Sequence, residues 1–541
     1  MESYSTVVCI GAGISGICLG AQLQRQLRST DIHIYDRNPD LGGTWWSNKY
    51  PGVACDVPTP LYSFSFEQNP SWSRFMASGD EIHAYIKAVA YKYDLPSRMT
   101  FNTECEGAEW DEQTEQWTVY LRHVQSGRTS VHRCKLFIAA AGILVDPKDF
   151  KVPGLESFKG SVVHTARWDI SLDLSDKNVV VIGNGCSATQ FIPAVVSKVR
   201  SLTQFIQDPQ WLVERRPFPY TPQLRWCLKN VPLLLRFQRI MLFKFYEENW
   251  PLFYLNEKGQ KARAQLAAAC TQWRLKAAPE KYREILAPPF DVACKRRIID
   301  TDYFKALHEP KVNLVQEKIQ EVGEHTVRSE SAEYPADVIV LAHGFEVLKT
   351  LGKMRIKGRT QTIDEHWKEF GGPEAYNTTA LHGFPNFGIV WGPNAVTGHN
   401  SAIFTIENAV NYILKVYKPV TEGEATTVEV KAQAEKDEVL SMQRDLKERV
   451  WAGCKSWYNT DSGWNGSTYP WSQVYFWWRS IFPKWDDWEI KQVKGATKSK
   501  KASTRTLHAS IVTLGISGIL INRANPLWWC NVQKQIRLLR A

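Results

Sequence analysis

The sequence predicts an α/β fold with two doubly wound dinucleotide-binding domains, and three features predict it. An apolar strand over residues 5–10 leads directly into the glycine-rich turn GAGISG, from Gly11 to Gly16. The same strand-and-turn unit recurs at residues 178–188, where NVVVI is followed by GNGCSA. A third apolar strand, 337–341, ends in AHG. Two such units in one chain indicate two dinucleotides, each bound by its own Rossmann-like domain.

The first turn has the pattern G-x-G-x-x-G between an apolar strand and an apolar helix that runs to Leu27. In this pattern Gly11 permits the tight turn, Gly13 lets the backbone approach a pyrophosphate, and Gly16 lets helix and strand pack closely. The helix N-terminus then offers free N–H groups and a positive dipole end to the pyrophosphate. Asp36 ends the following strand, where a carboxylate can accept hydrogen bonds from ribose hydroxyls.

The second turn, Gly183 and Gly185 followed by Ala188, has alanine where the pattern allows a small residue, so close packing of helix and strand is retained. Ser187 lies inside this turn, and no G-x-S-x-G pattern surrounds it, so we interpret it as a cofactor contact rather than a nucleophile. Gln207 and Asp208 follow the next strand. An NADP site usually places an arginine there, so this point leaves the choice between NADPH and NADH open.

The order of these units predicts one domain inserted into another. We expect the first part of one dinucleotide-binding domain at 1–150, a second dinucleotide-binding domain at 151–335, and the second part of the first domain, with an aromatic segment, at 336–490. A helical lobe at about 215–290 is expected inside the second domain, because that stretch is aromatic and lacks the turns of a parallel sheet.

Two further features are predicted in the last part of the chain. A charged amphipathic helix is expected from Ala425 to Val450, and residues 491–541 read as a tail with a basic run and an apolar stretch from Ala509 to Ile521. That stretch is about half the ~20 residues needed to span a bilayer. Either a peripheral membrane anchor or a helix packed on the protein surface fits this composition.

Composition restricts the class of protein. The 541 residues suggest more than one domain, and the net charge of +10 comes from dispersed Lys and Arg without a nucleic-acid motif. We therefore expect no nucleic-acid partner and assign the charge to anionic cofactors. The 11 cysteines form no CxxC pair, so no zinc or other metal site is predicted, and free thiols fit a reducing compartment. The N-terminus enters a strand at once, which favours a cytoplasmic location.

Two longer motifs lie between the glycine-rich turns. GGTWWSNKYPGVACD spans Gly42 to Asp56, and FKGSVVHTARWD spans Phe158 to Asp169. At every fixed position they match the two fingerprints of the type I Baeyer–Villiger monooxygenases, and the chain is similar to that family of flavoproteins. The similarity continues in CKRRIID, AHGF, FPNFGIVWGPN, GHNS and CKSWY, and so reaches to about residue 490.

The resemblance implies an enzyme with FAD and NADPH as cofactors, which uses O2 to convert a ketone into an ester or lactone through a flavin C4a-peroxide. Arg296 matches the active-site arginine of the family, and Asp56 matches the carboxylate that pairs with it. A guanidinium cannot lose its proton, so it can stabilise a peroxide anion and an oxyanion. Without the resemblance, Asp56 would read as a turn-capping carboxylate and Arg296 as a surface cation.

The resemblance also assigns cofactor contacts to other residues. Thr44, Trp45 and Tyr62 are expected near the flavin, where Trp45 packs rather than reacts. Lys295 resembles the residue that meets the 2′-phosphate of NADPH, and its alternative is a solvated lysine. His164, in the crossing between the domains, is expected to take part in nicotinamide handling, and its alternative is a structural histidine.

The substrate is expected to be a lipophilic ketone, because the helical lobe is rich in Leu, Phe and Trp. The chain further resembles fungal members of the family that act in secondary metabolism. Three alternatives stay open: an N- or S-oxygenating flavin monooxygenase, a flavin reductase or oxidase without an oxygenated product, and a binding protein without turnover. The Trp168–Asp169 ending argues against the first, the missing CxxC against a dithiol reductase, and the Asp56 and Arg296 pair against the last. The oligomeric state is not predicted.

Overall fold

A computed structural model describes residues 2–215, 218, 220–349 and 351–493. The apolar stretch from Ala509 to Ile521, and with it the choice between membrane anchor and packed helix, lies outside the described residues. Within the described ranges, no helix has both the length and the apolar character needed to cross a membrane.

The first sheet is built from both ends of the chain. Its strand order is β17-β4-β5-β6-β1-β2-β3, and β18 pairs with β6. The parallel centre consists of β6 (Thr129–Ala139), β1 (Glu2–Ile10), β2 (Ile32–Tyr35) and β3 (Met99–Thr100). β4 (Thr103–Asp111) and β5 (Gln116–His123) extend it as antiparallel neighbours. β17 (Arg355–Lys357) and β18 (Phe387–Ile389) come from the second half of the chain and join the same sheet.

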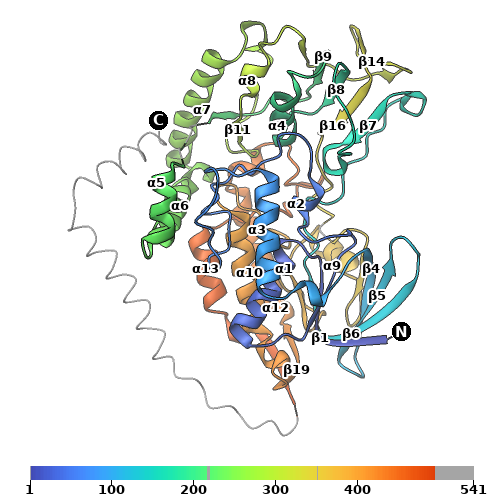
Figure 1. The fold of residues 1–541 in the computed structure, drawn as a ribbon. Helices are drawn as coiled ribbons and strands as arrows, with labels where there is room; N and C mark the ends of the chain where they lie inside the picture. Colours follow the sequence, from blue (N-terminus) through green and yellow to red (C-terminus); the bar gives the residue numbers. More distant parts are fainter. Residues whose placement is uncertain (1, 216–217, 219, 350, 494–541) are drawn as a thin grey trace, which may run out of the picture. The chain divides into compact units, whose positions relative to one another are not determined.

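The domain built on this first sheet also contains three helices, α1 (Ile14–Leu27), α3 (Gly79–Lys92) and α10 (Ala402–Val416). α1 packs against both α3 and α10, and the three lie close together in Figure 1. The first half of α1 is buried from Ser15 to Leu23, because small and aliphatic side chains let it pack on the sheet. The glycine-rich turn therefore sits on a rigid strand and helix.

The second sheet is entirely parallel, in the order β12-β9-β8-β16-β7. Its strands are β7 (Ser161–His164), β8 (Asn178–Ile182), β9 (Ser201–Phe205), β12 (Val312–Val315) and β16 (Val338–Leu341). α4 (Cys186–Val195) follows β8, as the second glycine-rich turn predicts. The sequence placed the end of this domain at residue 335, which is too early. β16 pairs with β7 and β8, because its continuous apolar run belongs in the centre of a parallel sheet.

The expected helical lobe consists of α5 (Pro222–Asn230), α6 (Leu234–Glu247) and α7 (Glu257–Ala277). β10 (Leu212–Glu214) and β11 (Ile298–Asp300) pair in parallel at the two ends of the lobe, so it leaves and rejoins the domain at one place. The shorter elements that complete the lists of helices and strands are α2 (Thr44–Ser47), α8 (Tyr303–Ala306), α9 (Ile363–Phe370), α11 (Lys418–Thr421), β13 (Glu321–Val322), β14 (Thr326–Arg328) and β15 (Glu333–Pro335).

The helix expected from Ala425 to Val450 is shorter than predicted. Residues Ala425–Val430 form strand β19, and helix α12 spans Ala432–Lys447. β19 pairs with β20 (Trp488–Gln492). The described part of the chain ends one residue later, at Val493. The segment ATTVEV is rich in β-branched residues, which favour a strand once a partner strand is present. α13 (Gln473–Ile481) precedes β20.

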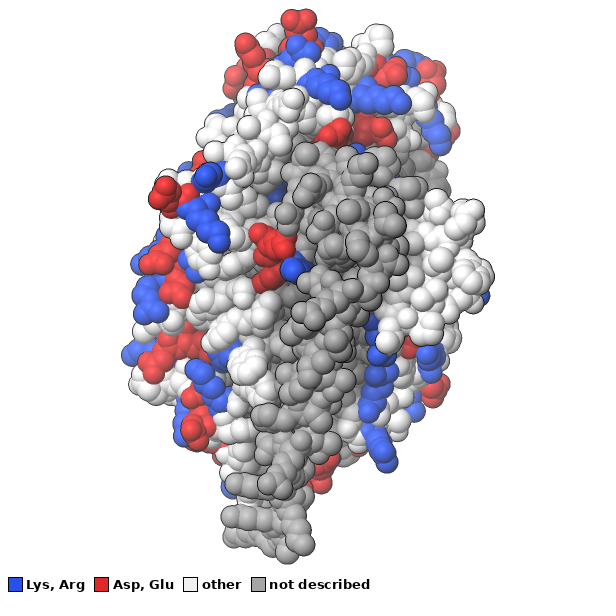
Figure 2. Space-filling model, turned by 90° about the vertical axis from the view of Figure 1, so that its left-hand side faces the viewer, with Lys and Arg blue, Asp and Glu red and all other residues white. Residues whose placement is uncertain are grey.

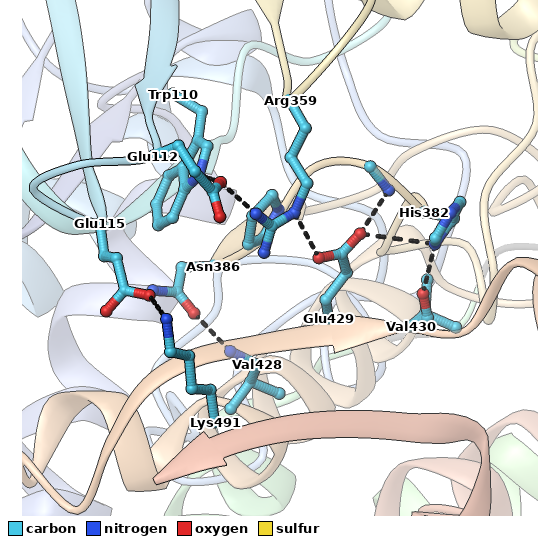
Figure 3. Close-up of polar contacts among 12 residues, drawn as sticks. Trp110, Glu112, Glu115, Arg359, His382, Asn386, Val428, Glu429, Val430 and Lys491 are labelled. Atoms are coloured by element: carbon cyan, nitrogen blue, oxygen red, sulfur yellow. Dashed lines mark hydrogen bonds and ion pairs between the residues drawn. The ribbon is translucent and has the colours of Figure 1, made fainter. Parts of the chain in front are cut away.

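Polar contacts attach this two-stranded ribbon to the first sheet (Figure 3). Arg359 bridges Glu112, beyond β4, and Glu429 of β19. The Asn386 side chain accepts a hydrogen bond from Val428 N at 2.8 Å, and Lys491 pairs with Glu115 at 2.6 Å. The ribbon depends on residues far away in sequence, which is why a local pattern did not reveal it.

Candidate active site

The backbone of the first glycine-rich turn packs closely against the end of β6. Gly11 has a φ of +114°, and a Cβ there would lie 2.3 Å from the carbonyl oxygen of Ala140. A Cβ on Gly16 would lie 2.0 Å from the Gly11 carbonyl oxygen, while a Cβ on Gly13 would lie 3.4 Å from the Cα of Gly43. Gly11 and Gly16 thus serve close backbone packing, and Gly13 is at the N-cap of α1, where the helix N–H groups are free.

A cavity opens at this turn. The predicted residues Gly11, Gly13, Asp36, Thr44, Trp45 and Tyr62 all line it, whereas Gly16 lies behind it in α1. The Asp36 carboxylate accepts hydrogen bonds from Ala12 N and Asn38 N, both at 2.8 Å. Burial raises the pKa of Asp36. These contacts hold the carboxylate at the cavity edge, where its remaining lone pairs can meet ribose hydroxyls.

Sequence reasoning missed Trp391 in this cavity. Its side chain lines the wall, and its indole Nε1–H is buried without a hydrogen-bond partner among the described residues. A buried donor of this kind normally has a partner, so its position fits a ligand with an acceptor atom. The cavity, its helix N-terminus and this donor fit FAD. The motif FPNFGIVWGPN contained Trp391, but the motif alone did not show which of its side chains faces the cavity.

The second turn repeats the geometry of the first. Gly183 has a φ of +115°, and a Cβ there would lie 2.4 Å from the Ala342 carbonyl oxygen. Ala188 is fully buried in α4, Ser187 is half-buried, and nothing lies within 4 Å of a Cβ on Gly185. The open position at Gly185 lets a pyrophosphate approach the backbone, as a nicotinamide dinucleotide requires.

Asp56 and Arg296 are brought together from opposite halves of the chain. Arg296 Nε donates to Asp56 Oδ2 at 3.0 Å, and Arg296 Nη2 donates to Asp56 Oδ1 at 2.6 Å. This two-point contact fixes the plane of the guanidinium. The negative charge of Asp56 raises the pKa of Arg296, so the cation is secured. Asp56 comes from the first fingerprint and Arg296 lies two residues before β11.

Three tyrosines surround the pair, of which Tyr458 is buried and Tyr62 and Tyr246 are half-buried. Tyr62, Tyr246 and Tyr458 are close enough to Arg296 for its charge to lower their pKa values, although burial raises each of them more strongly. The pKa of Tyr458 is raised to about 12. Phenols with such pKa values stay neutral at physiological pH. Neutral phenol side chains therefore lie around Arg296, together with the neighbouring guanidinium of Arg297.

The expectation that all cysteines are free is wrong for two of them. Cys294, two residues before Arg296, forms a disulfide with Cys454 of the CKSWY segment. The other described cysteines are free. The pair is separated by 160 residues, and no spacing rule connects cysteines so far apart, so only the fold reveals it. The bond joins the segment with Arg296 to the segment with Tyr458.

Lys295 turns away from Arg296 toward the end of β9. Its Nζ lies 3.1 Å from the carboxylate of Asp208 and 4.4 Å from the centre of the Phe290 ring. Asp208 follows the strand end where a 2′-phosphate is normally recognised. The structure thus places Lys295 beside the position at which Gln207 offered no cation.

His164 ends β7, at the edge of the second sheet. Its Nδ1 accepts a hydrogen bond from Ala166 N at 3.1 Å, and its Nε2 is buried without a partner among the described residues. Burial, helped by the charge of His343, lowers the pKa of His164 to about 4. His164 is therefore neutral at physiological pH, with one ring nitrogen left for another group.

These features define the class of protein as a flavin-dependent oxidoreductase with two dinucleotide sites. Residues 9–78 match the family model described as an NAD(P)-binding Rossmann-like domain. A Baeyer–Villiger monooxygenase of Streptomyces coelicolor is 34% identical over 480 residues, covering 87% of this chain and 89% of the relative. The FAD-binding monooxygenase ktnD of Aspergillus niger is 31% identical, covering 86% of this chain and 78% of the relative.

The chain belongs to the Baeyer–Villiger monooxygenase family and is a flavin monooxygenase. The family confirms FAD and NADPH as the expected cofactors. Among solved structures, cyclohexanone monooxygenase from Rhodococcus sp. Phi1 has the same fold, with a TM-score of 0.79 at 24% identity. That likeness covers 91% of this chain and 100% of the other, and confirms the predicted fold class.

Proposed function

We propose that this enzyme performs a Baeyer–Villiger oxidation, in which one oxygen atom of O2 is inserted beside the carbonyl of a lipophilic ketone. The products are an ester or lactone, water and NADP⁺. The two-point contact between Asp56 and Arg296 carries the proposal. The residues to which cofactor contacts were assigned also support it, because they lie along the two glycine-rich turns or beside the Asp56–Arg296 pair.

Bound FAD, reduced by NADPH, supplies the electrons that activate O2. Residues around the first cavity would hold the flavin: the N-terminus of α1, Asp36, Thr44, Trp45 and Trp391. Residues of the second turn, with Lys295, would hold NADPH, and His164 offers its free Nε2 on the same side of the domain. Trp45 Nε1 donates to the Tyr62 hydroxyl at 3.1 Å, which keeps both side chains in place.

Arg296 acts on the substrate. As the carbonyl carbon becomes tetrahedral, its oxygen gains negative charge, and a fixed guanidinium can donate hydrogen bonds to it. Asp56 holds the guanidinium in one plane, so little reorganisation is needed when the charge develops. The aromatic rings of Tyr62, Tyr246 and Tyr458 limit the access of water and favour a lipophilic substrate. A role in secondary metabolism is part of the proposal, and fungal relatives support it.

The test is product analysis with the purified FAD-containing enzyme, NADPH and a panel of lipophilic ketones, amines and sulfides. We expect esters or lactones from ketones, with close to one product molecule for each NADPH consumed. N-oxides or sulfoxides as the main products would replace the proposal by N- or S-oxygenation. Hydrogen peroxide as the sole product with every substrate would instead indicate an oxidase.

A further inference from the structure

One part of the helical lobe has an unusual distribution of charge. From Arg215 to Tyr246 the chain contains no Asp or Glu. The same stretch contains the basic residues Arg215, Arg216, Arg225, Lys229, Arg236, Arg239 and Lys244. Residues 222–246 of this stretch cover the α5–α6 hairpin, two adjacent helices, up to Glu247, the last residue of α6 and the first acidic one.

The outer face of this hairpin combines the basic side chains with exposed apolar ones. Trp226 on α5 is 64% exposed, and Leu233 at the tip is 69% exposed. Along α6 the exposed positions are Arg236, Ile240 and Lys244, which recur at helical spacing on one face. The left-hand side of the molecule in Figure 1 faces the viewer in Figure 2, where Lys and Arg are blue.

Packing does not explain these exposed side chains, because the inner face of the hairpin holds it in place. Arg239 is buried and donates to the carbonyl oxygens of Pro60 and Ser63 at 2.8 and 2.7 Å. Leu228 is buried in the same core as α10, and Leu242 and Phe243 pack against it. Exposed apolar groups that the fold does not need indicate contact with another surface.

We propose that the outer face of the α5–α6 hairpin docks on an anionic lipid surface. Tryptophan and aliphatic side chains enter the headgroup region, and flanking Lys and Arg bind lipid phosphates. A second copy of the chain fits less well, because a symmetric contact would bring the basic face of one hairpin against the same basic face of the other. If the proposed lipophilic substrate is correct, docking places the lobe where such molecules concentrate.

The test measures binding of the full-length, FAD-containing enzyme to vesicles of phosphatidylcholine with and without phosphatidylserine, by co-sedimentation. The variant Leu233→Asn with Arg236→Gln removes one apolar and one basic group from the tip. Asparagine suits position 233, because Leu233 has a φ of +64°. The matched control is Leu440→Asn with Lys436→Gln, at exposed positions on α12.

We expect the natural chain to sediment with phosphatidylserine vesicles and to be released by salt. The hairpin variant should bind about tenfold more weakly, while the α12 variant binds like the natural chain. Both variants should keep the flavin spectrum and the midpoint of thermal unfolding, which shows that they are folded. Equal binding by all three proteins would refute the proposal, as would a loss of self-association in the hairpin variant without any change in vesicle binding.

Discussion

At the scale of single residues, Arg296 has the most specific role, because the proposed function makes its guanidinium the fixed cation beside the reacting carbonyl. Replacing it by lysine removes the planar contact with Asp56 while keeping a positive charge. We expect Arg296→Lys to lower the rate of ester formation about 10²–10³-fold, the usual effect of losing one oxyanion donor. NADPH oxidation should continue and yield hydrogen peroxide, measured with a peroxidase assay.

Asp56→Asn is the matched variant, since it keeps the shape and removes the charge. A smaller loss, roughly tenfold, is expected because an amide still accepts one hydrogen bond from Arg296. Full ester formation in Arg296→Lys would show that the lysine ammonium replaces the guanidinium, and the oriented contact would then have no role.

Lys295 gives a prediction about cofactor choice. Lys295→Ala should raise the KM for NADPH about tenfold or more, because a phosphate loses a charged hydrogen bond, and should leave the KM for NADH unchanged. Asp208→Asn should act in the opposite direction, since Lys295 Nζ lies 3.1 Å from that carboxylate and would be released from it. Steady-state kinetics with both nicotinamides distinguish these effects. Equal changes for NADPH and NADH would contradict a 2′-phosphate contact.

The motifs allowed prediction of single residues only where a long fingerprint named them. Asp56 and Arg296 were expected to pair because both stand at fixed positions of the family pattern, and the structure brings them within hydrogen-bond distance. Trp391 and the disulfide between Cys294 and Cys454 could not be foreseen, because their contacts join segments far apart in the chain. Such contacts depend on the packed fold rather than on neighbouring residues.

At the scale of elements, the glycine-rich turns were predictable, whereas β19 was not. A turn of this type is a local structure, since its glycines, strand and helix are consecutive. β19 exists only because β20 pairs with it, and its residues otherwise continue into the polar pattern of α12. β16 was predicted as an apolar strand, but its place between β7 and β8 was not, because the order of strands in a sheet depends on the packed fold.

Helices α9 and α12 also share a buried cluster of titratable groups. His366 Nε2 lies 3.1 Å from the carboxylate of Glu374 and 3.2 Å from that of Glu435. Among the described residues, these three form the group whose potential metal-ligand atoms lie close together. Burial lowers the pKa of His366, but both carboxylates outweigh it and raise this pKa to about 10. Burial raises the pKa of Glu374 to about 8.

Both raised pKa values mean that the folded state binds protons more tightly than the unfolded state. The free energy of unfolding therefore falls as pH rises. For each group the fall occurs between its unfolded and folded pKa values. This range is about 4.5 to 8 for Glu374 and about 6.5 to 10 for His366. The slope is at most about 1.4 kcal/mol per pH unit for each group. We expect the thermal midpoint of the natural chain, measured with saturating FAD, to fall between pH 8 and 10.

The variant His366→Gln with Glu374→Gln removes both titrations while keeping polar side chains in the cluster. Its thermal midpoint should change less over the same pH range than that of the natural chain. Parallel curves for the two proteins would show that other groups cause the alkaline loss of stability.

At the scale of the whole molecule, the helical lobe connects the parts of the chain that the sequence assigned to different domains. α6 lies inside the expected second domain, yet Arg239 contacts the segment 60–63 and Glu407 of α10. Glu247, at the end of α6, pairs with His399 at 2.9 Å and accepts from Gln473 N at 2.8 Å. The insertion of one domain into another was predictable from motif order, but these contacts were not, because they join surfaces that have no shared sequence pattern.

The ion pair between Arg239 and Glu407 provides the corresponding prediction. Both side chains are buried, and the guanidinium reaches the carboxylate at 3.4 Å. Arg239→Met leaves Glu407 buried without its cation, which typically costs about 3–5 kcal/mol. We expect much faster hydrogen exchange of the α5–α6 amides in this variant, measured by mass spectrometry. Adding Glu407→Gln removes the uncompensated charge, so the double variant should recover part of the protection. If the double variant exchanges as fast as Arg239→Met alone, the hydrogen bonds from Arg239 to the carbonyl oxygens of residues 60–63 hold the lobe, and the charge pair contributes little.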